Sequence, residues 1–340
     1  MTSITSLGGG HGLFATLRAD RQVADHVTAV VTVADDGGSS GRLRRELGQI
    51  PPGDLRMALA ALSADTEKGD LWEKTLQHRF GGTGALAGHA IGNLIIAGLT
   101  SVMGNEVDAL DEIGRLLQIQ GRVVPMSPIP LEIEAEVVGL EQDARVVRQV
   151  RGQVAVATTP GQVRRIRLIP EAPPASEEAI EAILNADLVT LGPGSWFTSV
   201  LPHLQVPGLR DALQETNATT VVVLNLVAEP GETAGFSVER HLHVLAQHAP
   251  GFTVDDIIID AERVPSDRER DQLRRTATLL QAEVHFADVA RPGTPLHDTG
   301  KLAAVLDGVR VRKDPAAPAV KATEEIPIDG ARPRGDDAWR

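Results

Sequence analysis

The stretch VTVADDGGSSGRLRRE, residues 31–46, places two adjacent carboxylates, Asp35 and Asp36, at the end of an apolar β-branched run. An acid at the end of a second parallel strand can accept hydrogen bonds from ribose hydroxyls, and a carboxylate pair can instead hold Mg²⁺. Asp is also common in helix caps and turns. Two like charges side by side repel each other unless a cation or a donor compensates. The pair is therefore a candidate for contact with a ribose or with Mg²⁺.

The second half of this stretch supplies hydrogen-bond donors. Ser39 and Ser40 can cap a helix that we expect to start near Gly41, and Arg42 in its first turn could reach a phosphate held there. A basic first turn opposes the helix dipole, which favours an anionic partner for at least one of the arginines.

Two glycine-rich segments are candidate phosphate loops. GGGHG, residues 8–12, follows a short apolar run, and LGPGS, residues 191–195, follows another. Glycines admit close approach of an anion to the backbone, and free N–H groups at the start of a following helix attract it. A plain tight turn is the alternative for GGGHG, because its spacing is not the full G-x-G-x-x-G fingerprint. Of Trp196 and Phe197, one could stack on a base, and we expect at least one to pack in the core.

Further polar residues recur in similar settings. PPGDLR carries Asp54 and Arg56, although Asp54 could simply cap a helix. His89 and Asn93 stand four residues apart in an expected helix over 88–103, so they share a face that could grip a ligand. Asn225 follows another apolar run. The segment 297–299, His-Asp-Thr, could join this cluster or begin a helix.

The elements that must position these residues alternate between strands and helices. Apolar runs predict strands over 4–7, 27–33, 187–191, 219–226 and 256–260, and helices are expected after 12 and over 53–63 and 88–103. This alternation predicts an α/β protein with a doubly wound, mostly parallel sheet, whose ligands bind at the carboxyl ends of the strands.

Two regions differ from this pattern. Residues 121–170 include a period-two alternation over 131–137, which predicts a small β-rich insertion of antiparallel strands. The segment 314–340 is rich in Pro, Ala and charge, and we expect it to be a disordered tail after a single domain over 1–313.

Composition narrows the classes of function. The net charge of -13 and an aromatic content of 3% disfavour a nucleic-acid partner. The absence of Cys excludes disulfides and thiolate metal sites. No run approaches the roughly 20 apolar residues of a membrane span, and with no evident targeting segment we expect a cytoplasmic protein.

Taken in order, the motifs GGGHGL, VTVADDGGSSGRLRRE, PPGDLR, GHAIGN, LGPGSWFTSVLPHL, NLVAEPGETAGF and HDTGKLA resemble the YvcK/CofD-like family over about residues 3–312. They are more similar to its YvcK branch, the gluconeogenesis-factor group, than to its phospholactyl-transferase branch. The resemblance implies a Rossmann-like α/β fold. In the CofD branch it implies Mg²⁺-dependent transfer of 2-phospholactate from a guanosine diphosphate-activated donor to a deazaflavin. In the YvcK branch it implies binding of UDP-sugars such as UDP-N-acetylglucosamine, with NAD(P)-type dinucleotides as related ligands, and support of cell-envelope growth and shape on gluconeogenic carbon sources.

Carried over by motif, the resemblance assigns the glycine loop to a phosphate, the 35–42 stretch to a metal or ligand edge, and Asn93 with the 192–195 loop to a nucleotide pocket. His11 stands where many relatives carry Thr or Ser, and Leu296 where many carry a basic residue. Thr299 is by analogy a candidate site for a Ser/Thr kinase. The expected ligand-binding residues are Gly9, Gly10, His11, Gly12, Asp35, Asp36, Ser39, Arg42, Asp54, Arg56, His89, Asn93, Gly192, Gly194, Ser195 and Asn225, with Asp35 and Asp36 as the metal ligands.

The leading hypothesis is a cytoplasmic nucleotide-sugar-binding regulatory protein that forms a homodimer. The alternative is an Mg²⁺-dependent transferase acting on a nucleoside-diphosphate-activated donor. An NAD-dependent oxidoreductase is less favoured, because the sequence shows no evident proton-transfer constellation beside a hydride site. A purely structural scaffold would leave the glycine loops and acidic motifs without a reason.

Overall fold

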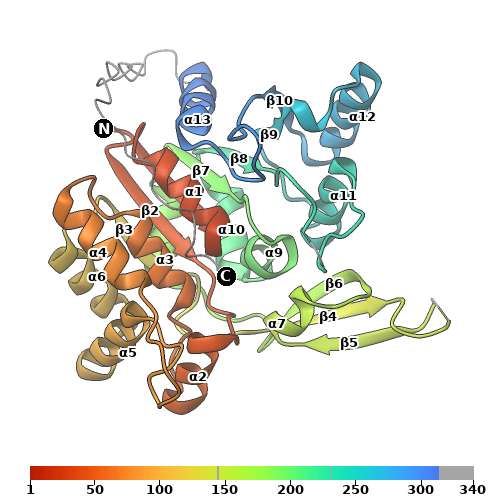
Figure 1. The fold of residues 1–340 in the computed structure, drawn as a ribbon. Helices are drawn as coiled ribbons and strands as arrows, with labels where there is room; N and C mark the ends of the chain where they lie inside the picture. The colour runs from red at the N-terminus through yellow and green to blue at the C-terminus, as the bar shows by residue number, and fades with distance from the viewer. Residues whose placement is uncertain (144, 230, 314–340) are drawn as a thin grey trace.

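The computed structural model describes residues 1–143, 145–229 and 231–313. Its centre is a seven-stranded sheet in the order β10-β9-β8-β7-β1-β2-β3, in which every neighbouring pair is parallel (Figure 1). The strands are β1 (Ser3–Gly8), β2 (His26–Val31), β3 (Arg122–Pro125), β7 (Leu188–Leu191), β8 (Thr219–Val223), β9 (Asp256–Asp260) and β10 (Glu283–Ala287). The chain starts in the middle of the sheet, winds outward to β3, and then returns to build β7 to β10 on the other side. The predicted doubly wound α/β fold is confirmed.

The central strands are rich in apolar residues because helices cover both faces of the sheet. All residues of β8 and β9 are buried. Leu302 and Leu306 of α13 (Thr299–Lys313) belong to one apolar cluster with Val221 of β8, whereas the next residue, Val222, belongs to the larger second cluster. This alternation follows from the period of two in a strand.

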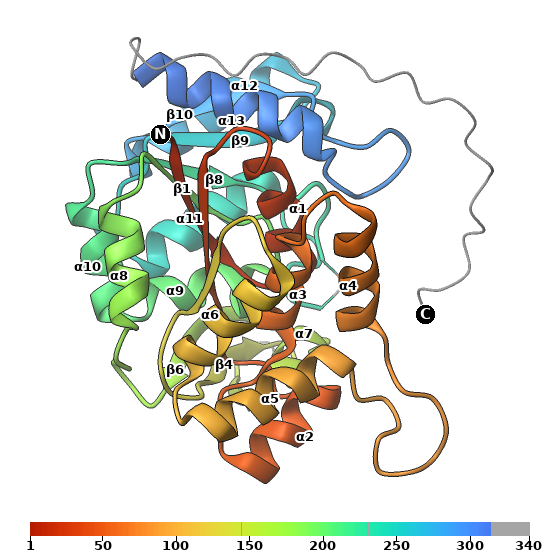
Figure 2. The same ribbon diagram turned by 90° about the vertical axis from the view of Figure 1, so that its left-hand side faces the viewer.

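The remaining helices lie between the strands in the sequence, and most of them pack around this sheet (Figure 2). They are α1 (Gly10–Asp20), α2 (Gly38–Leu47), α3 (Gly53–Ala61), α4 (Glu67–Gln77), α5 (Ile91–Met103), α6 (Glu106–Leu117), α7 (Gln153–Ala157), α8 (Glu177–Leu184), α9 (Leu201–Leu204), α10 (Pro207–Glu215), α11 (Val238–His248) and α12 (Asp267–Ala277). Among the described residues, no helix is long and apolar enough to cross a membrane.

A second sheet projects from the main body (Figure 1). It holds β4 (Glu132–Val138), β5 (Val147–Arg151) and β6 (Gln162–Ile169) in the antiparallel order β5-β4-β6. This is the β-rich insertion that the alternating pattern predicted. The sequence did not predict strand β5, because its residues VRQVR are mostly exposed and polar. At the start of the expected 121–170 range, β3 belongs to the main sheet instead.

Two helix starts differ from the prediction in ways that matter for the site. Helix α5 starts at Ile91 rather than at 88, so His89 lies in the segment before the helix. Helix α2 starts at Gly38, because the Gly41 N–H already donates to the Gly37 carbonyl, and Ser39 and Ser40 therefore lie inside its first turn. The predicted disordered tail, 314–340, lies outside the described residues.

Candidate functional site

The two glycine loops meet at the centre of the sheet. One follows β1 and the other follows β7, its neighbour, and the strand order reverses between these two strands. A Cβ atom on Gly12 would lie less than 3.0 Å from the Pro193 carbonyl oxygen, and one on Gly194 would lie 3.5 Å from the Gly9 carbonyl oxygen. The glycine at position 12 therefore permits the two loops to touch. This is the topological switch point, where doubly wound sheets bind their ligands.

Asn225, just after β8, fixes the second loop. Its Oδ1 accepts the Gly194 N–H at 2.8 Å, and its Nδ2 donates to the Gly194 carbonyl at 2.9 Å. From α1, the Thr16 hydroxyl donates to the Gly192 carbonyl at 3.1 Å. Because these bonds come from both sides, the loop is held in place before any ligand arrives.

A pocket of about 430 Å³ opens beside the two loops. Segments far apart in the sequence line it: His11, Gly12, Phe14, Ala15, Pro193, Gly194, Asn225, Leu226, Val227, Glu229, Arg291, Pro295, Leu296, His297, Asp298 and Thr299. The sequence left open whether the His-Asp-Thr segment, residues 297–299, joins the polar cluster or begins a helix, and in the structure it does both. It reaches the pocket, and Asp298 accepts the N–H groups of Gly300 and Lys301, at 3.0 Å each, at the start of α13.

Two buried polar atoms in the lining of this pocket have no hydrogen-bond partner in the described part of the chain: Glu229 Oε2 and His297 Nε2. Burial raises the pKa of Glu229, against the effect of a hydrogen bond with the Ser195 side chain. Burial lowers the pKa of His297 to about 4, so its imidazole is neutral at pH 7. Buried polar atoms without partners are costly. A polar ligand in the pocket would satisfy them.

On the β2 side of the glycine loop, predicted residues from α2, α3 and the start of α5 form a buried network. Ser39 Oγ lies 2.9 Å from His89 Nδ1, and Asn93 Nδ2 donates to Ser39 Oγ at 3.0 Å. Arg56 Nε in turn donates to Asn93 Oδ1 at 2.9 Å. His89 and Asn93 thus meet at Ser39, although they do not share one helix.

Asp54 links this network to the glycine loop. A Cβ atom on Gly9 would lie 2.6 Å from Asp54 Oδ2, and one on Gly53 would lie 2.7 Å from Asp35 Oδ2. Burial, and then the nearby charge of Asp35, raise the pKa of Asp54 to about 7, while the Gly10 N–H opposes this rise. Asp35 and Asp54 are therefore carboxyl neighbours beside the glycine loop.

Asp36 binds a different part of the chain from Asp35. Its Oδ1 accepts the Val154 N–H of α7 at 2.9 Å, whereas Asp35 Oδ1 accepts the Gly37 N–H at 2.9 Å. The adjacent carboxylates thus have different surroundings, because the β-rich insertion packs against Asp36. Arg42 also has a protein partner, since its Nη2 donates to the Ala87 carbonyl at 2.8 Å.

The aromatic pair after the second loop is part of the core. Trp196 and Phe197 are both fully buried, and neither lines the pocket. Trp196 packs edge-on against His241, with ring centroids 5.4 Å apart. The Phe197 N–H donates to Glu232 Oε2 at 2.9 Å, and burial raises the pKa of Glu232 to about 7. Core packing therefore accounts for both rings.

Sequence reasoning missed Arg291, which lines the pocket from the segment between β10 and α13. It missed this arginine because it did not identify β10, whose sequence EVHFA is only partly apolar. Had that strand been found, a basic residue shortly after its carboxyl end would have been a candidate.

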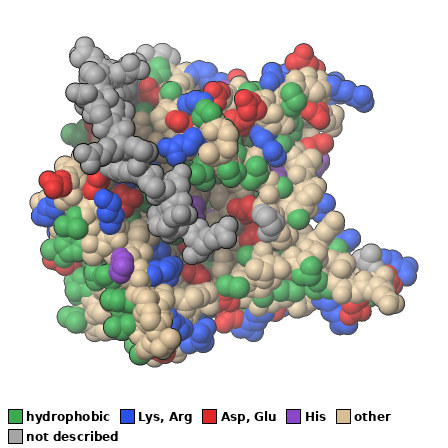
Figure 3. All heavy atoms as spheres, viewed as in Figure 1, with side chains coloured by type: hydrophobic (Ala, Val, Ile, Leu, Met, Phe, Trp, Pro, Cys, Tyr) green, Lys and Arg blue, Asp and Glu red, His purple; other side chains and the backbone are tan. Residues whose placement is uncertain are grey.

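Acidic and basic side chains are interleaved on the face of the molecule in Figure 3.

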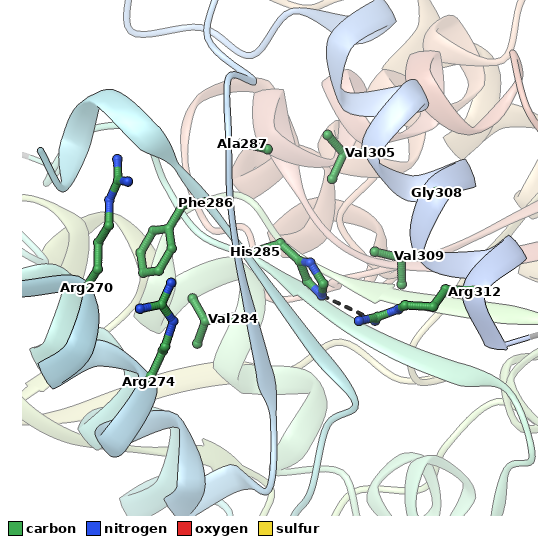
Figure 4. A pocket seen from close by; sticks show the side chains of 10 residues that line it. All are labelled: Arg270, Arg274, Val284, His285, Phe286, Ala287, Val305, Gly308, Val309 and Arg312. Atoms are coloured by element: carbon green, nitrogen blue, oxygen red, sulfur yellow. Dashed lines mark hydrogen bonds between the residues drawn. The ribbon is translucent and has the colours of Figure 1, made fainter. Parts of the chain in front are cut away.

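A second cavity, of about 490 Å³, lies between α12, β10 and α13 (Figure 4). By spacing alone, Asp256, Glu283 and His285 beside it could hold a metal ion. However, the Arg312 guanidinium forms ion pairs with both Asp256 and Glu283, and His285 Nε2 lies 2.7 Å from Asp256 Oδ1. A cation therefore already neutralises these acids, and this cavity lies apart from the glycine loops.

The strand order and the pocket together define a Rossmann-like, doubly wound α/β protein with a preformed pocket at its switch point. The chain belongs to the CofD family, whose model, described as 2-phospho-L-lactate transferase CofD, matches residues 4–296.

The relatives confirm the resemblance and specify the branch. The chain is 72% identical over 338 residues to a protein of Mycobacterium tuberculosis named "Putative gluconeogenesis factor", with 99% of each chain covered. It is 38% identical over 292 residues to a "Gluconeogenesis factor" of Halalkalibacterium halodurans, covering 86% of this chain and 88% of the relative.

A solved structure has the same fold. It is the crystal structure of a UPF0052 family member from Bacillus halodurans, which superposes with a TM-score of 0.79 at 33% identity. The match covers 90% of this chain and 98% of that chain.

Proposed function

We propose that this protein is a regulatory protein that binds a nucleotide sugar of the UDP-N-acetylglucosamine type in the pocket beside the two glycine loops. The observation that carries this proposal is the lining of the pocket. Two glycine loops surround one space of about 430 Å³, together with two buried polar atoms, Glu229 Oε2 and His297 Nε2, that have no hydrogen-bond partner among the residues that the structure describes. This volume lies within the range of about 300–1,000 Å³ for small-molecule sites.

The chemistry of the lining suits a nucleoside diphosphate. N–H groups at the start of α1 favour the diphosphate, and Arg291 adds a positive charge. Glu229 and His297 would bond to polar edges of the base or the sugar. The same loops would serve an NAD(P)-type dinucleotide, which we propose as a related ligand.

The relatives named gluconeogenesis factors support a regulatory role. We extend this to support of cell-envelope growth and shape on gluconeogenic carbon, by a cytoplasmic homodimer. Thr299 lines the pocket at the start of α13, so phosphorylation there by a Ser/Thr kinase would add negative charge beside the ligand. In this proposal such a charge weakens binding of a diphosphate.

The alternative function is that of an Mg²⁺-dependent transferase that acts on a nucleoside-diphosphate-activated donor. The family model favours it, as does the carboxyl pair Asp35 and Asp54 beside the glycine loop. These oxygen ligands fit Mg²⁺ better than the expected pair of Asp35 and Asp36, because Asp36 is bonded to the insertion. A bound Mg²⁺ would supply positive charge against a diphosphate.

Calorimetric titration with UDP-N-acetylglucosamine tests the leading proposal. We expect saturable binding, weakened about tenfold or more by Asn225→Ala, because loss of that amide frees the 192–195 loop. Asn185→Ala, at an exposed amide bonded to the Glu181 carbonyl, is the matched control and should leave affinity unchanged. If no UDP-sugar binds, the proposal is wrong.

A turnover assay separates the two functions. The regulator should bind the nucleotide sugar without consuming it. Release of a nucleoside monophosphate from an activated donor, abolished by EDTA, would instead establish the transferase.

A further inference from the structure

We propose that the chain carries a second anion site, separate from the nucleotide pocket, in which Arg56 and Arg79 hold a phosphate group beneath the glycine-rich segment 81–88. This site lies on the β2 side of the GGGHG loop, next to the network of Ser39 and Asn93. None of its residues lines the 430 Å³ pocket. The inference therefore does not depend on the proposed function.

Arg56 is the centre of this site. Only 4% of the residue is exposed, and its Nε donates to Asn93 Oδ1 at 2.9 Å. Its Nη1 is buried and has no hydrogen-bond partner among the described residues. A buried guanidinium with an unused N–H group is costly, and it binds oxyanions through planar charge-assisted hydrogen bonds. An anion at Nη1 would remove this cost.

The surroundings hold Arg56 in place. A Cβ atom on Gly92 would lie 2.7 Å from Arg56 Cγ, so the glycine leaves room for the arginine stem to cross α5. Asn93, the next residue, then fixes the guanidinium through its amide oxygen. The GHAIGN motif thus has a physical role, which is to fix this cation in one orientation.

A second cation lies nearby. Arg79 forms an isolated antiparallel bridge with Ala90, two residues before Gly92, the glycine beside the Arg56 stem. Two guanidinium groups held close together repel each other unless an anion lies between them.

The segment that follows Arg79 is rich in glycine. Residues 81–88 read GGTGALAG, and Arg79 Nη1 donates to the Gly88 carbonyl at 3.1 Å. A Cβ atom on Gly81 or Gly84 would have no neighbour within 4 Å, and of the glycines at 81, 82 and 84 only Gly82 has a positive φ, of 86°, so neither packing nor backbone conformation explains Gly81 and Gly84. Glycines instead allow backbone N–H groups to approach an anion closely.

The test is a titration with inorganic phosphate at constant ionic strength, read by calorimetry. We expect saturable binding to the unchanged chain. Arg79→Gln, at an exposed side chain, should weaken it about tenfold, and Arg56→Met should abolish it. Arg115→Gln, an exposed arginine on α6, is the control for net charge and should leave binding unchanged.

A repeat with saturating UDP-N-acetylglucosamine distinguishes this site from the nucleotide pocket. Unchanged phosphate affinity supports a separate site, and competition would overturn it. Equal phosphate affinity in wild type, Arg79→Gln and Arg115→Gln would also overturn it. If Arg56→Met fails to fold by circular dichroism, Arg79→Gln decides. If UDP-N-acetylglucosamine does not bind, the nucleotide proposal fails, and the variants still decide the phosphate site.

Discussion

At the scale of single residues, three carboxyl groups with similar pKa values have different roles. Burial raises the pKa of Asp20, Asp54 and Glu232 to about 7 in each case. Asp20 accepts a hydrogen bond from the Ser6 hydroxyl of β1, and Glu232 accepts one from the Phe197 N–H. Only Asp54 lies beside the glycine loop. A raised pKa by itself therefore does not identify the functional acid, whereas its position does.

Asp54→Asn should stabilise the fold at high pH. An acid whose pKa rises from 3.8 in the unfolded chain to about 7 in the fold loses stability as the pH rises through this window. The amide does not titrate, so the variant should gain on the order of 1–3 kcal/mol over wild type between pH 4.5 and pH 8. Thermal or urea unfolding at both pH values measures this gain.

Asp20→Asn is the matched control for this prediction. Asp20 is fully buried away from the glycine loops, and its pKa is raised to the same value. We expect the same pH-dependent gain in stability but unchanged ligand affinity, whereas Asp54→Asn should change both. A stability difference between Asp54→Asn and wild type that does not vary with pH would contradict the role given to burial.

At the scale of elements, the site depends on how closely the loops after β1 and β7 approach each other. Gly12→Ala should separate them, because the new methyl group would collide with the backbone carbonyl of Pro193, which has little freedom to move. We expect a loss of about 1–3 kcal/mol in the free energy of unfolding and weaker nucleotide binding.

Gly98→Ala is the control for Gly12→Ala. This glycine lies inside α5, where a Cβ atom would have no neighbour within 4 Å. Alanine there should stabilise the helix by about 0.5–1 kcal/mol and leave binding unchanged. Equal effects of the two substitutions would show that the contact between the loops is unimportant.

One of the hydrogen bonds that join the β-rich insertion to the main body is accepted by Asp36. Asp36→Ala removes the acceptor of the Val154 N–H, so this amide should exchange with solvent about tenfold faster, as measured by hydrogen exchange. Asp35→Ala should leave that amide protected and should instead weaken ligand or Mg²⁺ binding. If Asp36→Ala weakens ligand binding as much as Asp35→Ala does, the two carboxylates act together after all.

At the scale of the whole molecule, α13 connects the pocket to the far edge of the sheet. Thr299, its first residue, and Asp298, just before it, lie at the pocket, and its last turn places Arg312 against Asp256 of β9. Asp256 is fully buried, so its charge needs this partner. The final helix therefore both lines the site and compensates a buried charge.

Arg312→Met should lower the free energy of unfolding by about 1–3 kcal/mol, because it removes the guanidinium that pairs with the carboxylate of the buried Asp256. The loss is limited because water screens the ion pair of the partly exposed Arg312. Urea denaturation measures the change. Arg274→Met, which lines the same cavity but pairs with the exposed Asp271, should change stability by less than about 0.5 kcal/mol. Equal losses would contradict this account.

Much of the fold could be predicted from the sequence because the signals are local. A strand buried on both faces is mostly apolar and β-branched, as in TTVVV and DIIID. A loop that touches another backbone requires glycine, as at Gly12. These properties belong to short segments, so the sequence by itself determined the doubly wound sheet, the insertion and the two loops.

Only the tertiary structure decided which side chains face each other. Asp35 and Asp36 are neighbours in the sequence but have different surroundings, because the insertion packs against Asp36. The carboxyl group whose pKa the charge of Asp35 affects is that of Asp54. Glu229 and His297 reach one pocket from segments on either side of β9 and β10. The direction of a side chain depends on packing between distant segments, and no local pattern of residues encodes it.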